Sequence, residues 1–270
     1  MTPRVHEVMH HGLITCAPDA TLGQAARRMY QSGVHALVVV DLEGKPMGIL
    51  SDFDLLAGEW LSGDPKSLDV MRRMTAGEMM SAPPQTIEAD AQAADAADRM
   101  QREGIHRLLV LEAGRAVGVI SIGDLIKNLA EIPAQRSLVG DVMSRALVVC
   151  RQGTSLKAAA RAMTDRLSRS ILVVDPAGRP LGVVTGWDLL QVCDGDCGDR
   201  KVDEVMHPPI TIEPTASLRA AIDQMIQHKI HRLVVIDPQK PDAVPLGIIS
   251  TGDIFTEMAR PGSVWLPGEA

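Results

Sequence analysis

Short apolar runs and amphipathic stripes alternate along the chain, and one order of them recurs four times. In the first copy, residues 13–16 form a short apolar stretch, and residues 22–29 place apolar side chains on one face of a helix. Residues 36–40 are continuously apolar and rich in valine, which is typical of a strand buried on both faces. Residues 47–50 form a further apolar run after a turn, and a second helix is expected from Asp54. The predicted order is therefore strand, helix, strand, strand, helix.

The other three copies follow the same order, so the chain is best described as four repeats of one α/β unit. We predict repeat 1 at residues 1–60, repeat 2 at 76–130, repeat 3 at 138–192 and repeat 4 at 201–259. Repeats 1 and 2 are expected to form one module, residues 1–130, and repeats 3 and 4 a second, residues 137–260. A proline-bearing connector separates the two modules, and residues 261–270 are predicted to be a loose tail.

The most faithfully repeated stretch consists of glycine, two apolar residues, a hydroxyl residue, two variable residues, an aspartate and an apolar residue. It begins at Gly48, Gly118, Gly182 and Gly247. The apolar pair predicts the end of a buried strand, and the hydroxyl and the aspartate stand where the second helix begins. A glycine in every copy fits a tight turn or a close approach of backbone. The hydroxyl–aspartate pairs are Ser51 with Asp54, Ser121 with Asp124, Thr185 with Asp188, and Ser250 with Asp253.

The spacing of the hydroxyl and the aspartate has two compatible interpretations. In a capping box, the hydroxyl accepts from a free backbone N–H at the helix start, and the acid one turn on accepts from the N–H of the hydroxyl residue. A helix N-terminus also carries free N–H groups and a partial positive charge, which suit a phosphate. The hydroxyl can then donate to a phosphate oxygen, and the aspartate can accept from both hydroxyls of a ribose. The pattern leaves both interpretations open, because a ligand can bind the same groups that cap the helix.

The residues just before the central strand differ between the repeats. Arginine presents a planar fork of donors that suits phosphate oxygens, and histidine adds another donor. The alternative is that these are strand-edge residues in surface ion pairs. Repeats 2 and 4 have His106-Arg107 and His231-Arg232 at this point, where repeats 1 and 3 have His35-Ala36 and Arg169-Ser170.

Composition and charge narrow the class of protein. A net charge of −7 and a pI near 5.6 argue against non-specific binding to nucleic acid or to an anionic membrane. Aromatic residues make up only 2% of the chain, so aliphatic residues and methionine must form the core. The unbroken apolar runs are too short to cross a bilayer, and the N-terminus lacks the apolar core of a signal peptide. We therefore expect a cytoplasmic protein without membrane insertion.

Two small clusters are weak candidates for metal ligands. Cys193 and Cys197 flank an acidic stretch, but their spacing is not that of a zinc ribbon, and no second cysteine pair completes four ligands. His6 and His10 would lie one turn apart on a helix, but surface residues near a terminus are the simpler interpretation. No metal site is predicted, and the four cysteines do not form a disulfide framework.

These repeats resemble the CBS domain (the cystathionine beta-synthase repeat), and the chain resembles two CBS pairs, or Bateman modules, in tandem. The resemblance extends roughly from Pro3 to Ala259 and rests on the Gly-apolar-apolar-Ser/Thr-x-x-Asp stretch, which is intact in all four repeats. It implies that Asp54, Asp124, Asp188 and Asp253 hold ribose hydroxyls and that Ser51, Ser121, Thr185 and Ser250 meet phosphate or ribose. It also implies that the first strand of a repeat, with Thr15, Thr86 or Thr211, borders adenine, although threonine is an ordinary strand residue.

The Ile-His-Arg-Leu sequence of repeats 2 and 4 is further similar to the gamma subunit of AMP-activated protein kinase. That similarity implies that Arg107 and Arg232 bind nucleotide phosphates, with His106 and His231 beside them. Four-repeat relatives close their two modules into one disc, and the alternative is a homodimer in which two chains pair their modules.

The resemblance implies a non-catalytic sensor that binds an adenine nucleotide and thereby controls a partner protein in trans. AMP, ADP and ATP are the expected ligands, and S-adenosylmethionine, NAD and cyclic di-AMP are the alternatives. The sequence does not identify the partner or say whether Mg²⁺ accompanies the ligand. A structural scaffold with unused pockets is one other reading of the chain. A nucleotide hydrolase that uses the repeated aspartates is another, but the sequence offers no nucleophile with a base and an orienting group.

Overall fold

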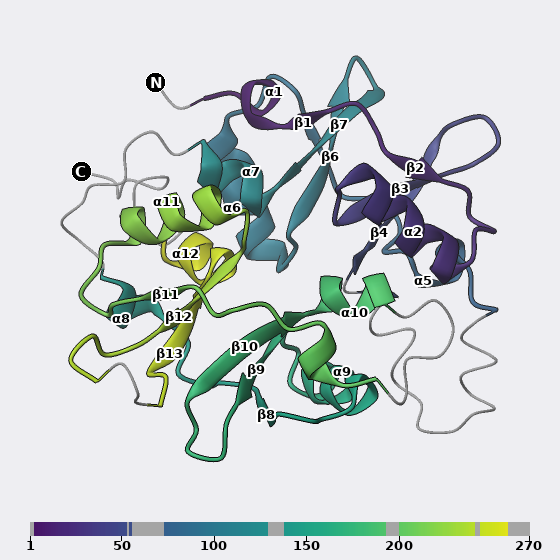
Figure 1. The fold of residues 1–270 in the computed structure, drawn as a ribbon. Coiled ribbons are helices and arrows are strands. Elements are labelled where there is room, and N and C mark those ends of the chain that lie inside the picture. The colour runs from purple at the N-terminus through teal and green to yellow at the C-terminus, as the bar shows by residue number, and fades with distance from the viewer. Residues whose placement is uncertain are drawn as a thin grey trace, which may run out of the picture. The chain divides into compact units, whose positions relative to one another are not determined.

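The computed structural model describes residues 3–52, 54–55, 73–128, 138–192, 200–240 and 244–258 (Figure 1). The predicted tail at 261–270 and the loop with Cys193 and Cys197 lie outside these described residues.

Each repeat has the predicted order of strand, helix, strand, strand and final helix. Repeat 1 contains β2 (Thr15–Cys16), α2 (Leu22–Ser32), β3 (Ala36–Val40) and β4 (Pro46–Ser51), followed by the start of a helix at Asp52. Repeat 2 contains β5 (Thr86–Glu88), α6 (Ala93–Glu103), β6 (Arg107–Glu112), β7 (Arg115–Ser121) and α7 (Ile122–Lys127). Repeat 3 contains β8 (Val149–Arg151), α9 (Leu156–Asp165), β9 (Ser170–Val174), β10 (Pro180–Thr185) and α10 (Gly186–Val192). Repeat 4 contains β11 (Thr211–Ile212), α11 (Leu218–His228), β12 (Arg232–Val235), β13 (Gly247–Ser250) and α12 (Thr251–Met258).

The boundaries differ slightly from those predicted. The final helix begins directly after the hydroxyl residue rather than at the aspartate, because the hydroxyl is the N-cap; in repeat 2, Ser121 caps α7. The first strand is shorter than predicted in repeat 1, where β2 has two residues. Residues 36–40 form the predicted strand; its centre is buried on both faces, since Leu37, Val38 and Val39 are at most 2% exposed, whereas Ala36 and Val40 at its ends are half-buried.

All four sheets share one topology. In each repeat the central strand pairs in parallel with the first strand and antiparallel with the last one. Repeat 2 has one strand more, because β1 (His10–His11) pairs with the outer edge of β7. The long helix between the first two strands is amphipathic: α2 buries Leu22, Ala25 and Met29 and ends at Gly33 with a positive φ of 63°.

The short helix that precedes each repeat packs against a different repeat. The N–H of Val5 in α1 (Val5–Val8) donates to Ala91 O of repeat 2 at 2.9 Å, and that of Ala76 in α5 (Ala76–Met79) donates to Ala20 O of repeat 1 at 2.8 Å. In the same way, Val139 in α8 (Val139–Val142) bonds to repeat 4, and Val202 in the 3-10 helix η1 (Val202–Glu204) bonds to repeat 3. Repeats 1 and 2 thus exchange their leading segments, and so do repeats 3 and 4.

This exchange explains the first glycine of the repeated stretch. A Cβ on Gly247 would lie 2.6 Å from Ser144 O, and a Cβ on Gly48 would lie 2.7 Å from Ser81 O. Both oxygens belong to the backbone of the segment that crosses over from the neighbouring repeat. The glycine is therefore required for a close approach of backbone.

Contacts divide the chain into two compact units. Unit 1 consists of Met1–Leu13, Gln85–Ala146 and Ile210–Ala270, and it contains repeats 2 and 4. Unit 2 consists of Ile14–Pro84 and Leu147–Pro209, and it contains repeats 1 and 3. The grouping of residues 1–130 and 137–260 into two modules stays a prediction.

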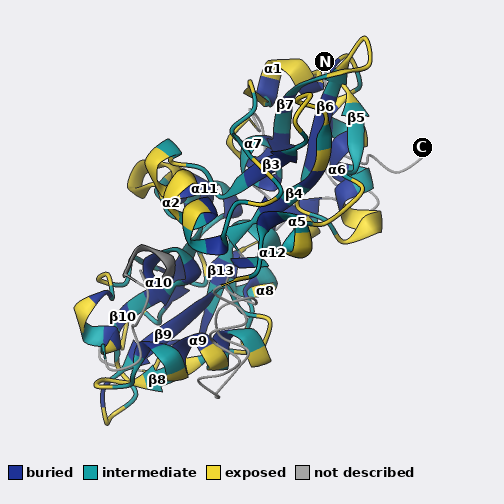
Figure 2. Cartoon of the chain, turned by 90° about the vertical axis from the view of Figure 1, so that its right-hand side faces the viewer, coloured by how far each residue is buried: buried dark blue, intermediate teal, exposed yellow. Residues whose placement is uncertain are grey.

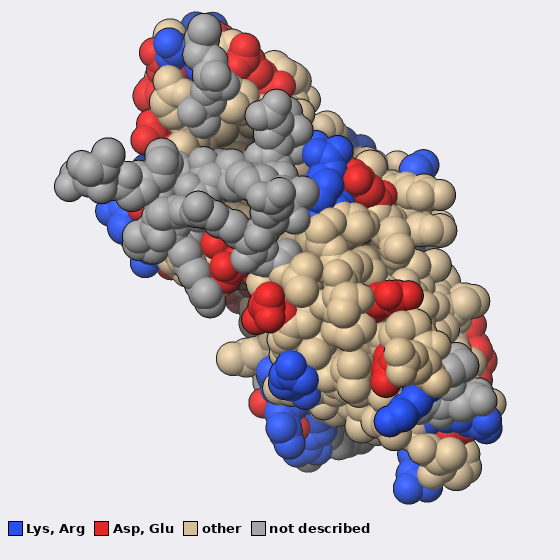
Figure 3. Space-filling view, turned by 90° about the vertical axis from the view of Figure 1, so that its left-hand side faces the viewer, with Lys and Arg blue, Asp and Glu red and all other residues tan. Residues whose placement is uncertain are grey.

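The cores of the two units are built differently. Unit 1 has one continuous apolar core to which both of its repeats contribute, and α7 and α12 pack against each other. In the described part of unit 2 there are two cores, one in each repeat, and Trp187 of repeat 3 packs against the core of repeat 1. The buried positions, dark blue in Figure 2, lie along the strands and the inner helix faces. On the face shown in Figure 3, acidic and basic side chains are scattered among uncharged residues.

Candidate functional site

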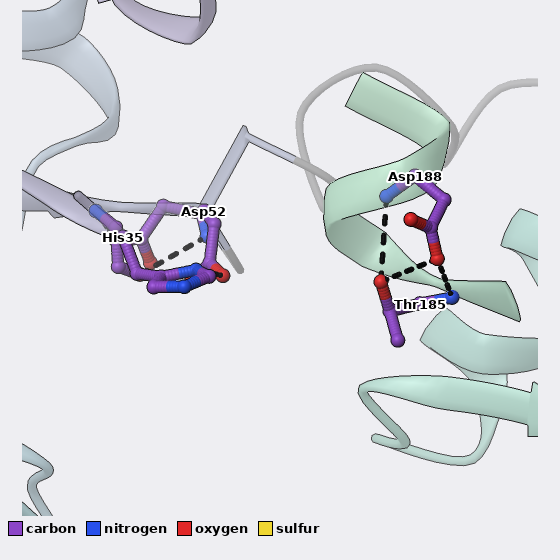
Figure 4. A network of polar contacts seen from close by, with 6 residues as sticks. His35, Asp52, Thr185 and Asp188 are labelled. Carbon is purple, nitrogen blue, oxygen red and sulfur yellow. Dashed lines mark hydrogen bonds and ion pairs between the residues drawn. The ribbon is translucent and has the colours of Figure 1, made fainter. Parts of the chain in front are cut away.

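The hydroxyl and the aspartate form a reciprocal cap in every repeat. The aspartate Oδ2 accepts from the backbone N–H of the hydroxyl residue at 2.7–2.9 Å and from the hydroxyl itself at 2.6–2.7 Å. The N–H of the aspartate donates back to the hydroxyl oxygen at 3.3–3.4 Å. Figure 4 shows this arrangement for Thr185 and Asp188. The capping interpretation is thus confirmed.

The cap has consequences for any ligand at these residues. The hydroxyl already donates to the aspartate, so this hydrogen bond must break before the hydroxyl can donate to a phosphate. The second carboxylate oxygen, Oδ1, takes no part in the cap and is the atom suited to accept from a ribose hydroxyl.

Repeat 3 departs from the others at this second oxygen. Asp188 Oδ1 is 2.8 Å from Nε2 of His207, which follows η1 on the segment exchanged from repeat 4. Asp188 is only 7% exposed, whereas the His207 side chain is 69% exposed. Both oxygens of Asp188 are therefore hydrogen-bonded within the chain.

The strand register brings each arginine of the His-Arg pairs to the cap of its own repeat. Arg107 begins β6 directly opposite Ser121, and Arg232 begins β12 directly opposite Ser250. The carbonyl of His106 accepts from the N–H of Ile122, the residue after that serine, at 3.1 Å. The equivalent carbonyl of His231 accepts from the N–H of the residue after Ser250 at 3.0 Å. The predicted ligand residues of repeats 2 and 4 are the hydroxyl residue, the aspartate and the His-Arg pair. In each of these repeats they lie together at one end of the sheet.

The predicted adenine-lining threonines lie elsewhere in each sheet. Thr15, Thr86 and Thr211 pair with Val38, Leu109 and Val234 of the central strand, on the side away from the capped strand. They occupy one equivalent position, which is Val149 in repeat 3. Their contact with adenine stays a prediction.

Three residues of unit 2 were not singled out from the sequence. Asp52 Oδ2 is 3.0 Å from Nδ1 of His35, and Figure 4 shows these two residues next to each other. The ring of Trp187 lies 4.7 Å from that of His35 and 6.0 Å from that of Tyr30, measured between centroids. The third is His207, the partner of Asp188. Asp52 and Trp187 could have been noticed in the sequence, because an acidic residue and an aromatic residue stand out at the two variable positions of the repeated stretch.

The metal candidates and the thiols have structural roles where they are described. His6 Nδ1 is 2.9 Å from Ala89 O, and His10 lies in β1, beyond the end of α1, so the two do not share a helix. Among the described residues, no group of three His, Cys, Asp or Glu side chains is placed to hold a metal ion. Burial raises the pKa of the Cys16 and Cys150 thiols, which pack against the cores of repeats 1 and 3. No helix within the described part of the chain is long and apolar enough to cross a membrane.

Comparison with known proteins identifies the family. The model of the CBS domain matches residues 5–59, 76–131, 139–195 and 202–260. The chain therefore belongs to the CBS domain family, and its four repeats are CBS domains. The predicted fold class, α/β repeats of the Bateman type, is confirmed.

Two similar proteins come from an archaeon. Protein MJ1404 of Methanocaldococcus jannaschii is 30% identical over 144 residues, which are 48% of this chain and 32% of that protein. The chain thus spans about a third of the length of that relative. Protein MJ1225 of the same organism is 24% identical over 201 residues, 69% of each chain. The crystal structure of MJ1225, described as a proposed archaeal homologue of g-AMPK, covers 94% of this chain with a TM-score of 0.80 and 20% identity. That likeness shows a shared fold.

Proposed function

We propose that the protein is a non-catalytic regulatory protein that binds an adenine nucleotide in unit 1, at repeats 2 and 4. The observation that carries the proposal is the position of Arg107 and Arg232, which begin their strands directly opposite the capping serines Ser121 and Ser250. An arginine at this strand position lies next to the start of the helix, where a phosphate is favoured.

In this proposal each of the two sites offers groups for the ribose, the phosphates and the adenine. The ribose hydroxyls donate to Oδ1 of Asp124 or Asp253, the oxygen that the cap leaves unused. The arginine, with His106 or His231 beside it, binds the phosphates, and Thr86 or Thr211 borders the adenine. AMP, ADP and ATP all satisfy this arrangement.

Regulation follows if the ligand binds one conformation of the chain better than another, since only differential affinity shifts a conformational equilibrium. A partner protein then senses that conformation in trans. The description of the similar protein MJ1225 as a proposed homologue of g-AMPK is in keeping with such a role.

Isothermal titration calorimetry with AMP, ADP and ATP tests the proposal on the wild-type chain, Arg107→Ala and Arg232→Ala. Loss of a charge-assisted hydrogen bond costs about 1.5–3 kcal/mol, so each variant should bind at its own site roughly tenfold or more weakly. Arg102→Ala is the matched control, because Arg102 is an exposed arginine of the same repeat paired with Asp98. Absence of binding by the folded wild type, or an equal loss in Arg102→Ala, contradicts the proposal.

The scaffold alternative has one observation in its favour, in repeat 3. There His207 already occupies the Asp188 oxygen that a ribose needs. A scaffold predicts that no adenine nucleotide raises the melting temperature, whereas binding to the folded state must raise it. The hydrolase alternative predicts release of phosphate from ATP that disappears in Asp124→Ala and Asp253→Ala.

A further inference from the structure

One residue of each exchanged segment lies beside the capped strand of the repeat that the segment covers. It directly follows a methionine, and its backbone pairs with the residue after the repeated glycine. The N–H···O distances in these pairs are 2.9–3.1 Å for Ser81 with Ile49, Ser144 with Ile248, and His207 with Val183. His10 has the same register, opposite Val119. Repeats 1 and 4 therefore have a serine at this position, and repeats 2 and 3 have a histidine.

The two histidines make different contacts with the caps beside them. His207 Nε2 donates to Asp188 Oδ1 at 2.8 Å, while the cap uses Oδ2 of the same carboxylate. In repeat 2, His10 has the corresponding register, but among the described contacts no hydrogen bond joins its side chain to Asp124. The same two residue types are thus bonded to each other in repeat 3 and apart in repeat 2.

Burial indicates that the histidine of repeat 3 can leave its partner. The His207 side chain is 69% exposed, so it can move away from Asp188 without leaving a cavity in the core. Asp188 is 7% exposed, whereas the other three capping aspartates are half-buried. A buried carboxylate oxygen without a donor is costly, so Oδ1 needs either the imidazole or another donor in its place. A ribose hydroxyl is such a donor, and it competes with His207 for one atom.

We propose that His207 blocks repeat 3 from within the chain, because its imidazole occupies the carboxylate oxygen that a ribose would use. The inference rests on the proposed function, in which Oδ1 of a capping aspartate accepts from the ribose. Nucleotide enters repeat 3 only in the fraction of molecules in which His207 has left Asp188, and the apparent affinity falls by that fraction. A residue outside the repeated stretch therefore determines which repeats are occupied.

Trp187 provides a readout at this cap, because it directly precedes Asp188. The chain has three tryptophans, so Trp60→Phe with Trp265→Phe leaves Trp187 as the single fluorophore. AMP is titrated into this background with and without His207→Ser. Serine is the residue that repeats 1 and 4 have at this position, so the fold accommodates it there. We expect the Trp187 emission of His207→Ser to saturate at an AMP concentration at least about tenfold lower, which corresponds to an open fraction of about a tenth or less.

Two further variants in the same background serve as controls. His10→Ser makes the same substitution at the matching position of repeat 2, and it should leave the response of Trp187 unchanged. His207→Ser combined with Asp188→Ala removes the acceptor as well as the histidine, and it should abolish the gain. Circular dichroism confirms that each variant is folded.

The outcomes separate this inference from the proposed function. If His207→Ser leaves the saturating AMP concentration unchanged, if His10→Ser lowers it as much, or if the gain persists without Asp188, the inference is wrong. If Trp187 responds in none of the variants while calorimetry still detects AMP binding that depends on Arg107, the inference is wrong and the proposed function stands. If only His207→Ser binds AMP and the wild type does not, the inference stands and the assignment of the sites to unit 1 fails.

Discussion

One carboxylate oxygen organises the start of the last helix in repeats 1 to 4, and the other oxygen distinguishes the repeats. Oδ2 accepts the two hydrogen bonds of the cap in each of them. Oδ1 is bonded to His207 in repeat 3, where the aspartate is also the most deeply buried. The motif is therefore uniform in sequence but not in its hydrogen bonds, because a residue outside the motif can already donate to Oδ1.

The glycine that opens each repeated stretch gives a prediction at the same scale. Gly247→Ala should destabilise the folded chain by about 1–3 kcal/mol, since its Cβ would lie 2.6 Å from the Ser144 carbonyl oxygen and backbone must shift to relieve the contact. Gly252→Ala in the same repeat is the matched control, because a Cβ there meets only the Ser250 hydroxyl at 3.6 Å. Urea unfolding followed by circular dichroism compares the two, and equal midpoints would contradict the argument.

Residue-level expectations succeeded where the determinants are local. The hydroxyl and its aspartate lie within one helical turn, so their cap follows from spacing alone. The bond between His207 and Asp188 does not, because it depends on which segment crosses beside β10. The sequence offers one indication that His207 occupies a defined place in its repeat: it follows Met206, as His10 follows Met9 at the corresponding point of the first repeat.

At the scale of elements, the short helices that precede the four repeats were not predicted, and the sequence does not show which repeat they pack against. Their residues match from repeat to repeat, so they look like the first element of the repeat that follows. In the structure, α1 completes repeat 2 and α5 completes repeat 1. A four-residue helix has no stability of its own and takes its position from the surface that it covers, so its sequence cannot specify where it packs. The longer strands and helices were predicted well, because burial imposes a period on them.

The turn between β9 and β10 gives a prediction of pH dependence. Backbone N–H groups, above all that of Arg179, and the Arg179 guanidinium hold the pKa of Asp175 below its ordinary value of 3.8. A lowered folded pKa stabilises the fold above pH 3.8, and this stabilisation is lost as the pH falls through the folded pKa. Asp175→Asn should therefore lower the melting temperature at pH 7 and have a smaller effect at pH 3.

Thermal melts at several pH values measure this difference. Asp165→Asn is the control, since Asp165 is exposed and lies 3.9 Å from Arg161 in a solvated pair. It should change the melting temperature little at any pH. If Asp175→Asn lowers the melting temperature by the same amount at pH 7 and pH 3, the carboxylate charge contributes nothing to the stability of the turn.

At the scale of the whole molecule, the units differ in how their repeats depend on each other. The core of unit 1 runs through repeats 2 and 4, so neither repeat has a complete core alone. Among the residues of unit 2 that the structure describes, the two cores are separate, and Trp187 makes a contact between the repeats. Damage to one repeat should therefore spread to its neighbour in unit 1 and stay local in unit 2, since regions that share a core open together.

Ile254→Ala and Leu189→Ala form a matched pair for this argument. Each residue directly follows its capping aspartate, and each is 0% exposed. Truncation of either should cost about 2–5 kcal/mol. Ile254 belongs to the shared core and Leu189 to the core of repeat 3. Hydrogen exchange measured by mass spectrometry should become faster in both repeats 2 and 4 for Ile254→Ala, but only in repeat 3 for Leu189→Ala. If repeat 2 keeps its protection in Ile254→Ala, the continuous core does not couple the two repeats, and each CBS domain of unit 1 is stable on its own.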